Sequence, residues 1–348
     1  MSSRVLFEES IEGAQHGGKG LAGFGRFAME TCGAPGGIVA DNVLVGPDGT
    51  VKTAETVRSE LPEGFRIHAL SMHCLFWVMG TAWTQSKTIR PFIPENLHAA
   101  PVEKIRQWAE DRILALLDLS ADLNNKLVAI FWGVYQGWEA ATGYPWGLFS
   151  GQGYDLLSEG QERFVKETQK VRDHARSAGI KLCHEVHRNS AAKNSAEVWR
   201  LLEICDKDPC LAVLFDPSHR WEGESVETML RRLADLICLV HVKDCAWQDG
   251  EDLTTWATDD WTQRPMYFTA LGEGKINLEA YVRTLISIGY AQRYCAIQGT
   301  EKAPLPSEAE AAHMDLDTCA QNGVHFIRER LIYPVPSVAF DRAMGAST

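Results

Sequence analysis

Four short apolar segments of the chain end in side chains that bind metals or transfer protons. They read LCHEVH (182–187), VLFDPSH (213–219), CLVHVKD (238–244) and CAIQG (295–299). An apolar run that turns polar at its end is typical of a buried parallel strand whose carboxyl end opens onto an active site. In chain order these segments supply Glu185, Asp216, His241 and Gln298. Two carboxylates, an imidazole and an amide oxygen predict a divalent cation, Mn²⁺ first, with Mg²⁺, Co²⁺ or Zn²⁺ as alternatives.

Two histidines near these strand ends are candidates for proton transfer. His187 lies two residues after Glu185, so both side chains face the same side of a strand. An imidazole there is suited to act as a general base or acid, and a structural histidine is the alternative. His219 follows Asp216 by three residues and could bond to a substrate hydroxyl. The alternative for Asp216 is a helix cap.

The segment LVHVKD adds a lysine to the candidate site. Lys243 shares a strand face with His241, and an ammonium there can stabilise an anionic oxygen. A surface ion pair between Lys243 and Asp244 is the alternative.

Strand-like runs alternate with helical patterns along the whole chain. The expected strands are 4–8, 37–41, 65–70, 127–132, 180–186, 211–215, 237–241 and 293–297. The expected helices include 101–124, 159–178, 277–289 (with Asn277 as its N-cap) and a last one near 306–331. This alternation, without a break in composition, predicts one α/β domain over residues 1–348, a (β/α)8 TIM barrel whose residues 306–348 form a last helix and tail. An open doubly wound sheet is the alternative, but GAQHGGKG (13–20) lacks its phosphate-binding pattern.

Three connections are longer than usual and rich in Trp and Tyr, at 71–100, 133–158 and 245–270. All three follow strands, which places them on the carboxyl-terminal face of a barrel. They are expected to wall a substrate pocket or contact a partner, and a satellite hydrophobic cluster is the alternative. His73, Trp132 and Glu273 (in LGEGKIN) are the predicted substrate contacts in or beside these connections.

Composition limits the classes of function. The net charge of -12 over 348 residues argues against a nucleic-acid partner. Nine cysteines, an odd number without a CxxC pair, fit a reducing cytoplasm rather than a disulfide framework. The first residues lack the apolar core of a signal peptide, and no run of roughly 18 apolar residues predicts a membrane span.

The strand-end Glu of HEVH, the DPSH segment, HVKD and GEGKIN together resemble the xylose isomerase-like TIM-barrel superfamily. IHALSMHC (67–74) is similar to an early strand segment of that superfamily. The resemblance covers about residues 60 to 330 and is loose before residue 60. It implies a metal held by Glu185, Asp216, His241 and a final acidic residue, and Gln298 stands where that acidic residue is expected.

An amide cannot move a proton, so Gln298 argues against a two-carboxylate epimerase mechanism and favours His187 as the base. Within the superfamily, the chain looks most similar to the large subunit of bacterial C-glycoside deglycosidases. That resemblance implies a lyase that cleaves the C–C bond of an aryl 3-oxo-C-glycoside by proton abstraction and β-elimination, together with a small second subunit. The alternatives are a sugar or inositol isomerase, epimerase or dehydratase, and a non-catalytic carbohydrate-binding or scaffold barrel.

Overall fold

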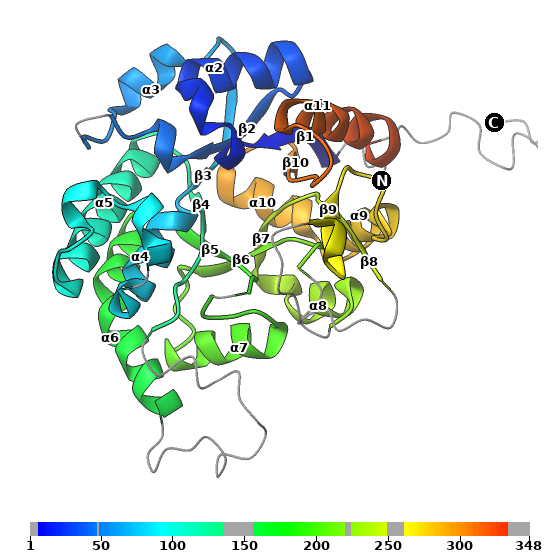
Figure 1. The fold of residues 1–348 in the computed structure, drawn as a ribbon. Coiled ribbons are helices and arrows are strands. Elements are labelled where there is room, and N and C mark those ends of the chain that lie inside the picture. Colours follow the sequence, from blue (N-terminus) through cyan, green and yellow to red (C-terminus); the bar gives the residue numbers. More distant parts are fainter. Residues whose placement is uncertain are drawn as a thin grey trace, which may run out of the picture.

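The computed structural model describes residues 6–46, 49–85, 87–135, 156–188, 190–219, 224–248 and 261–332. Eight parallel strands form a barrel with the helices around it (Figure 1). The strands are β1 (Phe7–Glu12), β2 (Gly36–Ala40), β3 (Arg66–Ser71), β4 (Leu127–Ile130), β5 (Lys181–Glu185), β6 (Leu211–Phe215), β7 (Ile237–Val240) and β10 (Ala303–Ser307). Each neighbours the next in this order, and β10 pairs with β1. The predicted (β/α)8 barrel is confirmed.

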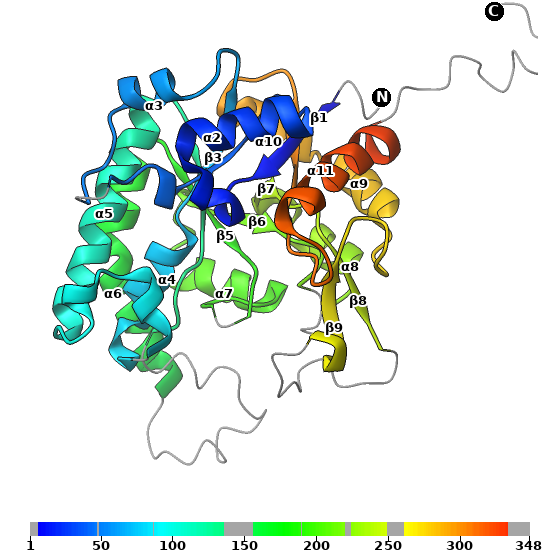
Figure 2. The same ribbon diagram turned by 45° about the horizontal axis from the view of Figure 1, so that its top comes forward.

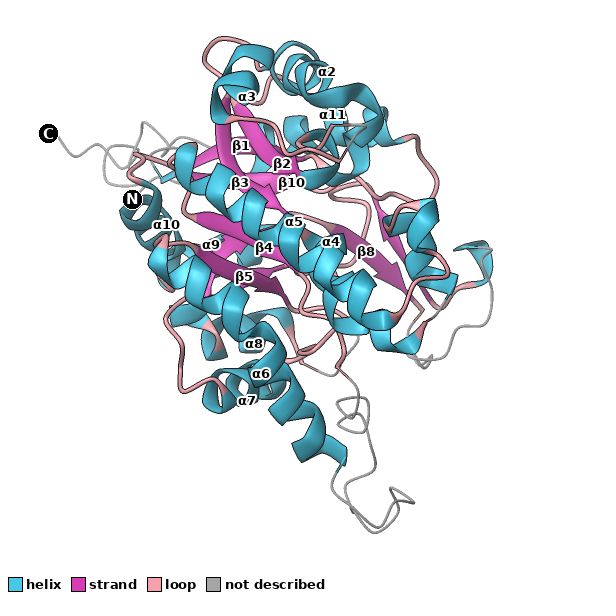
Figure 3. Ribbon diagram, turned by 90° about the vertical axis from the view of Figure 1, so that its left-hand side faces the viewer, coloured by secondary structure: helices cyan, strands magenta, loops and turns pink. Residues whose placement is uncertain are grey.

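Helices cover the outside of the barrel, and Figure 3 shows α5 and α6 lying along its outer side near β4 and β5. They are α2 (Gly20–Arg26), α3 (Ala54–Glu60), α4 (His73–Thr81), α5 (Val102–Asp122), α6 (Leu156–Ser177), α7 (Ser195–Ile204), α8 (Val226–Arg232), α9 (Leu278–Ser287), α10 (Tyr290–Gln298) and α11 (Leu316–Phe326). The predicted N-cap of α9 is confirmed, because the Asn277 side chain accepts a hydrogen bond from Ala280 N at 2.9 Å. In the described part of the chain, no helix has both the length and the apolar character needed to cross a membrane.

The first strand lies further along the chain than the expected range 4–8. In β1 the residues alternate, so that Phe7 stacks on Tyr290 of α10 at 6.2 Å while Ser10 Oγ lies 2.7 Å from His68 Nδ1 inside the barrel. The strand therefore places Phe7 and Ile11 toward the helices, together with Glu9, which pairs with Arg328 at 2.9 Å, and it places Glu8, Ser10 and Glu12 toward the barrel interior. The pattern of FEESIE, not the apolar run before it, marks this strand.

The eighth strand is at 303–307, and the prediction of 293–297 is wrong. Residues 293–297 belong to α10, which is flanked by Gly289 and Gly299 with φ of 73° and 72°. The strand itself reads APLPS. Proline lacks an amide proton and is usually excluded from the interior of a sheet, which is why the sequence favoured the wrong segment.

The two prolines lie at the seam where the barrel closes. Between β7 and β10, Val242 N donates to Pro306 O at 2.7 Å, and Glu308 N donates to Val242 O at 3.2 Å. Val242 and Ser307 form a parallel bridge there. A proline contributes a carbonyl to such a seam but cannot donate a hydrogen bond to it.

The structure describes parts of the three predicted long connections. A two-stranded antiparallel hairpin, β8 (Asp244–Trp247) and β9 (Met266–Thr269), lies within 245–270 and stands out from the barrel in Figure 2. The connection 71–100 contains α4 and short 3-10 turns. Residues 136–155 and 249–260 lie outside the described residues. They contain several of the Trp and Tyr residues on which the prediction of these connections rests.

Candidate metal centre

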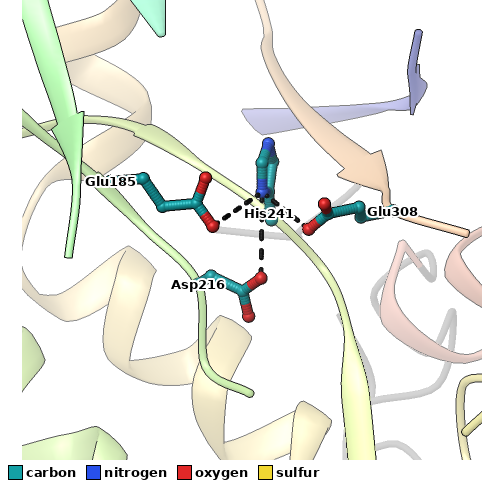
Figure 4. A group of neighbouring side chains, drawn as sticks. All are labelled: Glu185, Asp216, His241 and Glu308. Atoms are coloured by element: carbon teal, nitrogen blue, oxygen red, sulfur yellow. Dashed lines mark ion pairs between the residues drawn. The ribbon is translucent and has the colours of Figure 1, made fainter. Parts of the chain in front are cut away.

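Four side chains at the carboxyl ends of four barrel strands meet at one point. Glu185 is the last residue of β5, and Asp216, His241 and Glu308 directly follow β6, β7 and β10. Their ligand atoms all lie within 4.8 Å of one another. Figure 4 shows three carboxylates around one imidazole, with His241 Nδ1 at 2.9 Å from Glu308 Oε2, 3.7 Å from Glu185 Oε1 and 3.8 Å from Asp216 Oδ2.

The buried polar atoms of this cluster fit a divalent cation. Among the described residues, Asp216 Oδ2, His241 Nδ1 and Glu308 Oε2 make ion-pair contacts but no hydrogen bond of regular geometry. The side chains of Glu185, Asp216 and Glu308 are only 3%, 0% and 9% exposed. Three carboxylates buried this closely are unfavourable unless a cation compensates their charge. Three carboxylates and an imidazole are donors that Mn²⁺ and similar ions accept.

The structure does not bring Gln298 to this cluster. Gln298 ends α10, where its amide oxygen accepts from Lys126 N at 2.8 Å and its amide nitrogen donates to His68 O at 3.0 Å. Lys126 directly precedes β4, so this contact lies at the amino-terminal end of the barrel. Glu308 is the fourth residue of the cluster instead. The fourth residue is therefore acidic, as the superfamily resemblance implies, and not an amide.

Charges within the cluster shift its pKa values. Burial disfavours ionised Asp216, but the positive charges of His219 and Lys243 hold its pKa well below the ordinary value. Burial raises the pKa of Glu308 despite the attraction of Lys243 and His241. Burial alone would lower the pKa of His241, but the Glu308 and Glu185 carboxylates raise it well above the ordinary value. The site therefore favours positive charge at its centre.

Two further histidines hold the carboxylate of Glu185 from both sides. His73 Nε2 is 3.1 Å from Glu185 Oε2, and His219 Nε2 is 3.1 Å from Glu185 Oε1. His219 Nε2 is also 3.3 Å from Asp216 Oδ2. Burial would lower the pKa of His219, yet the Asp216 and Glu185 carboxylates raise it. Both predicted residues thus contact the carboxylates of the cluster.

His187 lies one ring further out. Its ring centroid is 4.2 Å from that of His219, and its Nδ1 is 2.6 Å from the carbonyl oxygen of Arg188. A carbonyl only accepts, so Nδ1 carries the proton and Nε2 is left as an acceptor. Burial and the neighbouring His219 lower the pKa of His187 to about 4. His184 points the opposite way, as the strand alternation predicts, and its ring binds Trp132 N and Ala192 O at 3.2 and 3.0 Å.

Lys243 is buried beside the cluster, and its predicted alternative role in a surface ion pair is not observed. Its Nζ is 3.2 Å from Glu308 Oε2 and pairs with Glu310. The same ammonium lies 4.0 Å from the centre of the Phe268 ring in β9. Asp244 instead binds the β9–α9 loop, since its Oδ2 accepts from the amides of Gly272 and Gly274 at 3.0 Å each.

Trp132 does not reach the cluster. Its side chain is fully buried in the core, where it meets Phe76 of α4 and Phe164 of α6 edge to face at 4.9 and 5.2 Å. The preceding residue, Phe131, contacts the site instead, with its ring 4.3 Å from His73 and 4.8 Å from His187. Consecutive side chains at a strand end point in opposite directions, and the larger aromatic is the one directed outward.

Glu273 lies at the rim rather than at the cluster. It is 55% exposed, and its carboxylate pairs with His313 at 2.9 Å. This contact joins the loops that follow β9 and β10.

Besides Glu308 and Glu310, two more acidic residues near the site were not predicted. Glu12, the last residue of β1, places Oε2 at 3.3 Å from His241 Nε2. Asp41 directly follows β2, and burial raises its pKa to about 6 despite the opposing charge of His73. The rule that identified Glu185, a polar residue at the end of an apolar strand, would also have found Asp41, which ends the predicted run 37–41.

The chain matches the family model of the xylose isomerase-like TIM barrel over residues 90–315. It belongs to this family. The superfamily resemblance is thereby confirmed, and the narrower resemblance to C-glycoside deglycosidases stays a prediction.

Among curated proteins, the chain is 29% identical over 92 residues to an inosose dehydratase of Lacticaseibacillus casei, covering 26% of this chain and 30% of that protein. It is 23% identical over 167 residues to an inosose dehydratase of Clostridium perfringens, covering 47% and 55%. The matched region thus spans about a third to a half of these relatives.

Solved structures share the fold over nearly the whole chain. The probable 3-DHS dehydratase AsbF from Bacillus anthracis has a TM-score of 0.60 at 12% identity, covering 93% of this chain and 99% of that one. The 3-keto-D-glucoside 4-epimerase YcjR from E. coli has a TM-score of 0.58 at 13% identity, covering 93% and 99%. At these identities the likeness concerns the fold alone.

Proposed function

We propose that the chain is a divalent-metal-dependent enzyme that removes a proton next to the carbonyl group of a sugar or of a cyclic polyhydroxy ketone and then eliminates a β-substituent. The carrying observation is the buried Glu185, Asp216, His241 and Glu308 cluster beside a neutral histidine, His187. A divalent metal bound at this cluster would act as a Lewis acid and stabilise negative charge on the carbonyl oxygen of the substrate. Glu185, Asp216, His241 and Glu308 would hold it, with Mn²⁺ as the first expectation.

His187 is the proposed base. Its Nδ1 proton is bound to the Arg188 carbonyl, so its Nε2 lone pair is available to accept a proton from carbon. Its lowered pKa, about 4, keeps it unprotonated at neutral pH. Lys243 is the proposed donor to an oxygen that gains negative charge, because Glu308 and Glu310 keep its ammonium at the site. His219 is the proposed partner for the leaving group or a substrate hydroxyl.

Loss of water is the form of elimination that the relatives favour. Both curated relatives carry the name inosose dehydratase, and a dehydratase joins proton removal to the departure of a β-hydroxyl. The same groups could return the proton to carbon, which would make the enzyme an epimerase or isomerase. Glu308 restores a second glutamate to the site, so the chemical objection to that reaction no longer holds.

The C-glycoside lyase is the second candidate. It needs the same proton removal, followed by cleavage of the C–C bond to the aryl group; the departing aryl carbon takes up a proton, for which His219 is the proposed donor. The observation that favours it is aromatic: Phe131 lies against His73 and His187, and Phe268 lies against His219 and Lys243. Two rings beside the site would suit a flat aryl aglycone. A small second subunit belongs to this candidate only.

Proton exchange at carbon tests the shared step. The purified chain would be incubated in D₂O with an inosose, an aryl 3-oxo-C-glucoside and a panel of free ketoses, each with Mn²⁺ and with EDTA. Deuterium in recovered substrate, abolished by EDTA, is expected for the correct substrate class. Water loss identifies a dehydratase, free aglycone a lyase, and ketose interconversion an epimerase. A protein that binds no metal, or that binds it but exchanges no proton in any of these substrates, contradicts the proposal.

A further inference from the structure

We propose that Glu12 is a positioning residue that fixes the proton of His241 on Nε2 and so leaves Nδ1 free to bind the metal. The inference rests on the proposed metal site and adds a residue from a fifth strand of the barrel. Glu12 ends β1, whereas the ligands come from β5, β6, β7 and β10.

The two ring nitrogens of His241 face different surroundings. Nδ1 faces the carboxylates of Glu308, Glu185 and Asp216. Nε2 faces Glu12 Oε2 at 3.3 Å, and both side chains are only 1% exposed. Neither atom makes a hydrogen bond of regular geometry to any described residue, and the contact between them is the ion pair that the structure shows for each. The main chain of His241 is held separately, because Tyr281 Oη donates to its carbonyl at 2.9 Å.

Only one tautomer of a neutral imidazole can use Nδ1 as a ligand. The proton must then be on Nε2, and a partner that accepts from Nε2 selects that form and orients the ring. Glu12 Oε2 is the acceptor in reach. A proton on Nδ1 would remove the lone pair from the side that faces the three carboxylates.

The same arrangement occurs a second time on the same strand. Glu8 Oε1 is 3.0 Å from His68 Nε2, and Ser10 Oγ is 2.7 Å from His68 Nδ1. With its Nε2 proton bound by Glu8, the His68 Nδ1 can accept from the serine. Glu8 thus pairs with a histidine as Glu12 does, but away from the metal cluster, which makes it a matched control.

Both oxygens of Glu12 are engaged, which makes the isosteric amide informative. Oε1 accepts from Ala14 N at 3.0 Å, and Oε2 faces His241 Nε2. A glutamine has one acceptor oxygen for two donors. In Glu12→Gln, whichever way the amide turns, an NH₂ group faces either Ala14 N or His241 Nε2.

The test is Mn²⁺ titration of EDTA-treated full-length protein by calorimetry, comparing wild type, Glu12→Gln and Glu8→Gln. The Kd for Mn²⁺ is expected to rise roughly 10–100-fold in Glu12→Gln, as for other partners of metal-binding histidines, and to stay at the wild-type value in Glu8→Gln. In Zn²⁺-loaded, ¹⁵N-labelled protein, the His241 ring should show the Nε2-protonated pattern in wild type and lose or broaden it only in Glu12→Gln. Circular dichroism checks that each variant is folded.

Each outcome separates the two proposals. Equal Mn²⁺ affinity and an unchanged His241 signal in Glu12→Gln overturn the role of Glu12 and leave the metal site standing. Equal loss of affinity in Glu8→Gln also overturns it, because the effect would then be general to the strand. The proposed site holds one Mn²⁺ per chain. A wild type that binds two ions, one of which is lost in Glu12→Gln, overturns the inference as well, because Glu12 would then itself be a metal ligand. A wild type that binds no Mn²⁺ refutes the proposed function, and the Glu12 inference with it.

Discussion

Substituting Gln298 and Glu308 separately tests which of the two residues completes the metal site. Gln298 ties the end of α10 to Lys126 N and His68 O, at the amino-terminal end of the barrel. Glu308 Oε2 lies 2.9 Å from His241 Nδ1 at the opposite end. We expect Gln298→Ala to lower stability without changing metal affinity, and Glu308→Gln to lower metal affinity.

The stability effect of Gln298→Ala follows from two lost hydrogen bonds. Each such bond contributes about 0.5–1.5 kcal/mol net, and water can replace part of it because the residue is half-buried. A total loss of about 1–2 kcal/mol is expected. Unfolding entropy of about 2.1 cal/mol/K per residue makes this a fall in Tm of roughly 1–3 °C for a chain of this length.

The affinity effect of Glu308→Gln follows from the loss of a ligand charge. The amide can still accept from Gln15 Nε2, which donates to Glu308 Oε1 at 3.0 Å, so the shape of the site is kept. The Kd for Mn²⁺ should rise by more than the roughly 10–100-fold seen when partners of metal ligands are lost. Glu308 also pairs with His241 and Lys243 at 2.9 and 3.2 Å, so the variant leaves two buried cations with one anionic partner fewer and should lower the stability of the metal-free protein as well.

Calorimetric titration with Mn²⁺ and thermal unfolding of the metal-free proteins measure both effects. The reasoning is refuted if Gln298→Ala weakens Mn²⁺ binding as much as Glu308→Gln does. It is also refuted if Glu308→Gln binds Mn²⁺ with wild-type affinity.

Three further predictions concern other parts of the molecule. His187→Asn should reduce proton exchange and turnover by roughly 10²–10⁴-fold with metal still bound, and an unchanged rate would exclude His187 as the base. Asp208→Asn should cost about 3–5 kcal/mol at pH 7, because it leaves the buried guanidinium of Arg172, 2.8 Å from Asp208, without that partner. Despite the burial of Asp208, hydrogen bonds from the Arg176 and Arg172 guanidinium groups depress its pKa. The ionised Asp208 therefore stabilises the folded protein above about pH 4, and this stabilisation is lost as the pH falls toward the pKa of the folded state. The difference in Tm between variant and wild type should be smaller at pH 3 than at pH 7. Trp132→Phe should lower the free energy of unfolding by roughly 1–3 kcal/mol with an unchanged KM, whereas Phe131→Ala should raise KM. A raised KM in Trp132→Phe together with an unchanged KM in Phe131→Ala would show that Trp132, not Phe131, contacts the substrate.

Three of the four cluster residues could be predicted because their strands follow the simplest pattern. The runs before Asp216 and His241 are continuously apolar, as expected for parallel strands covered on both sides, and the run before Glu185 is apolar at Leu182 and Cys183; in all three the metal-binding type of residue falls at the strand end. Local sequence is sufficient in these places because burial and strand propensity favour the same assignment.

The fourth strand-end residue could not be predicted in this way, because local preference and tertiary structure disagree. APLPS contains two prolines and reads as a loop, whereas RYCAI reads as a strand but forms a helix between two glycines. A strand at the seam can accept proline because the neighbouring strand supplies the donors, and only the closed barrel reveals that. Glu12 was missed for a related reason: its strand turns polar side chains into the barrel, so it lacks the apolar run that marks the others.

Barrel closure and assembly of the metal site depend on the same few residues. The seam is joined by Val242 N to Pro306 O at 2.7 Å and by Glu308 N to Val242 O at 3.2 Å. Val242 lies between His241 and Lys243, and Glu308 itself donates one of the two bonds. The last strand therefore cannot separate from β7 without moving Glu308 away from His241. Because a proline strand contributes few donors to this seam, a cation held between His241 and Glu308 would also hold the two sides of the barrel together, and metal binding should stabilise the closed fold by mass action.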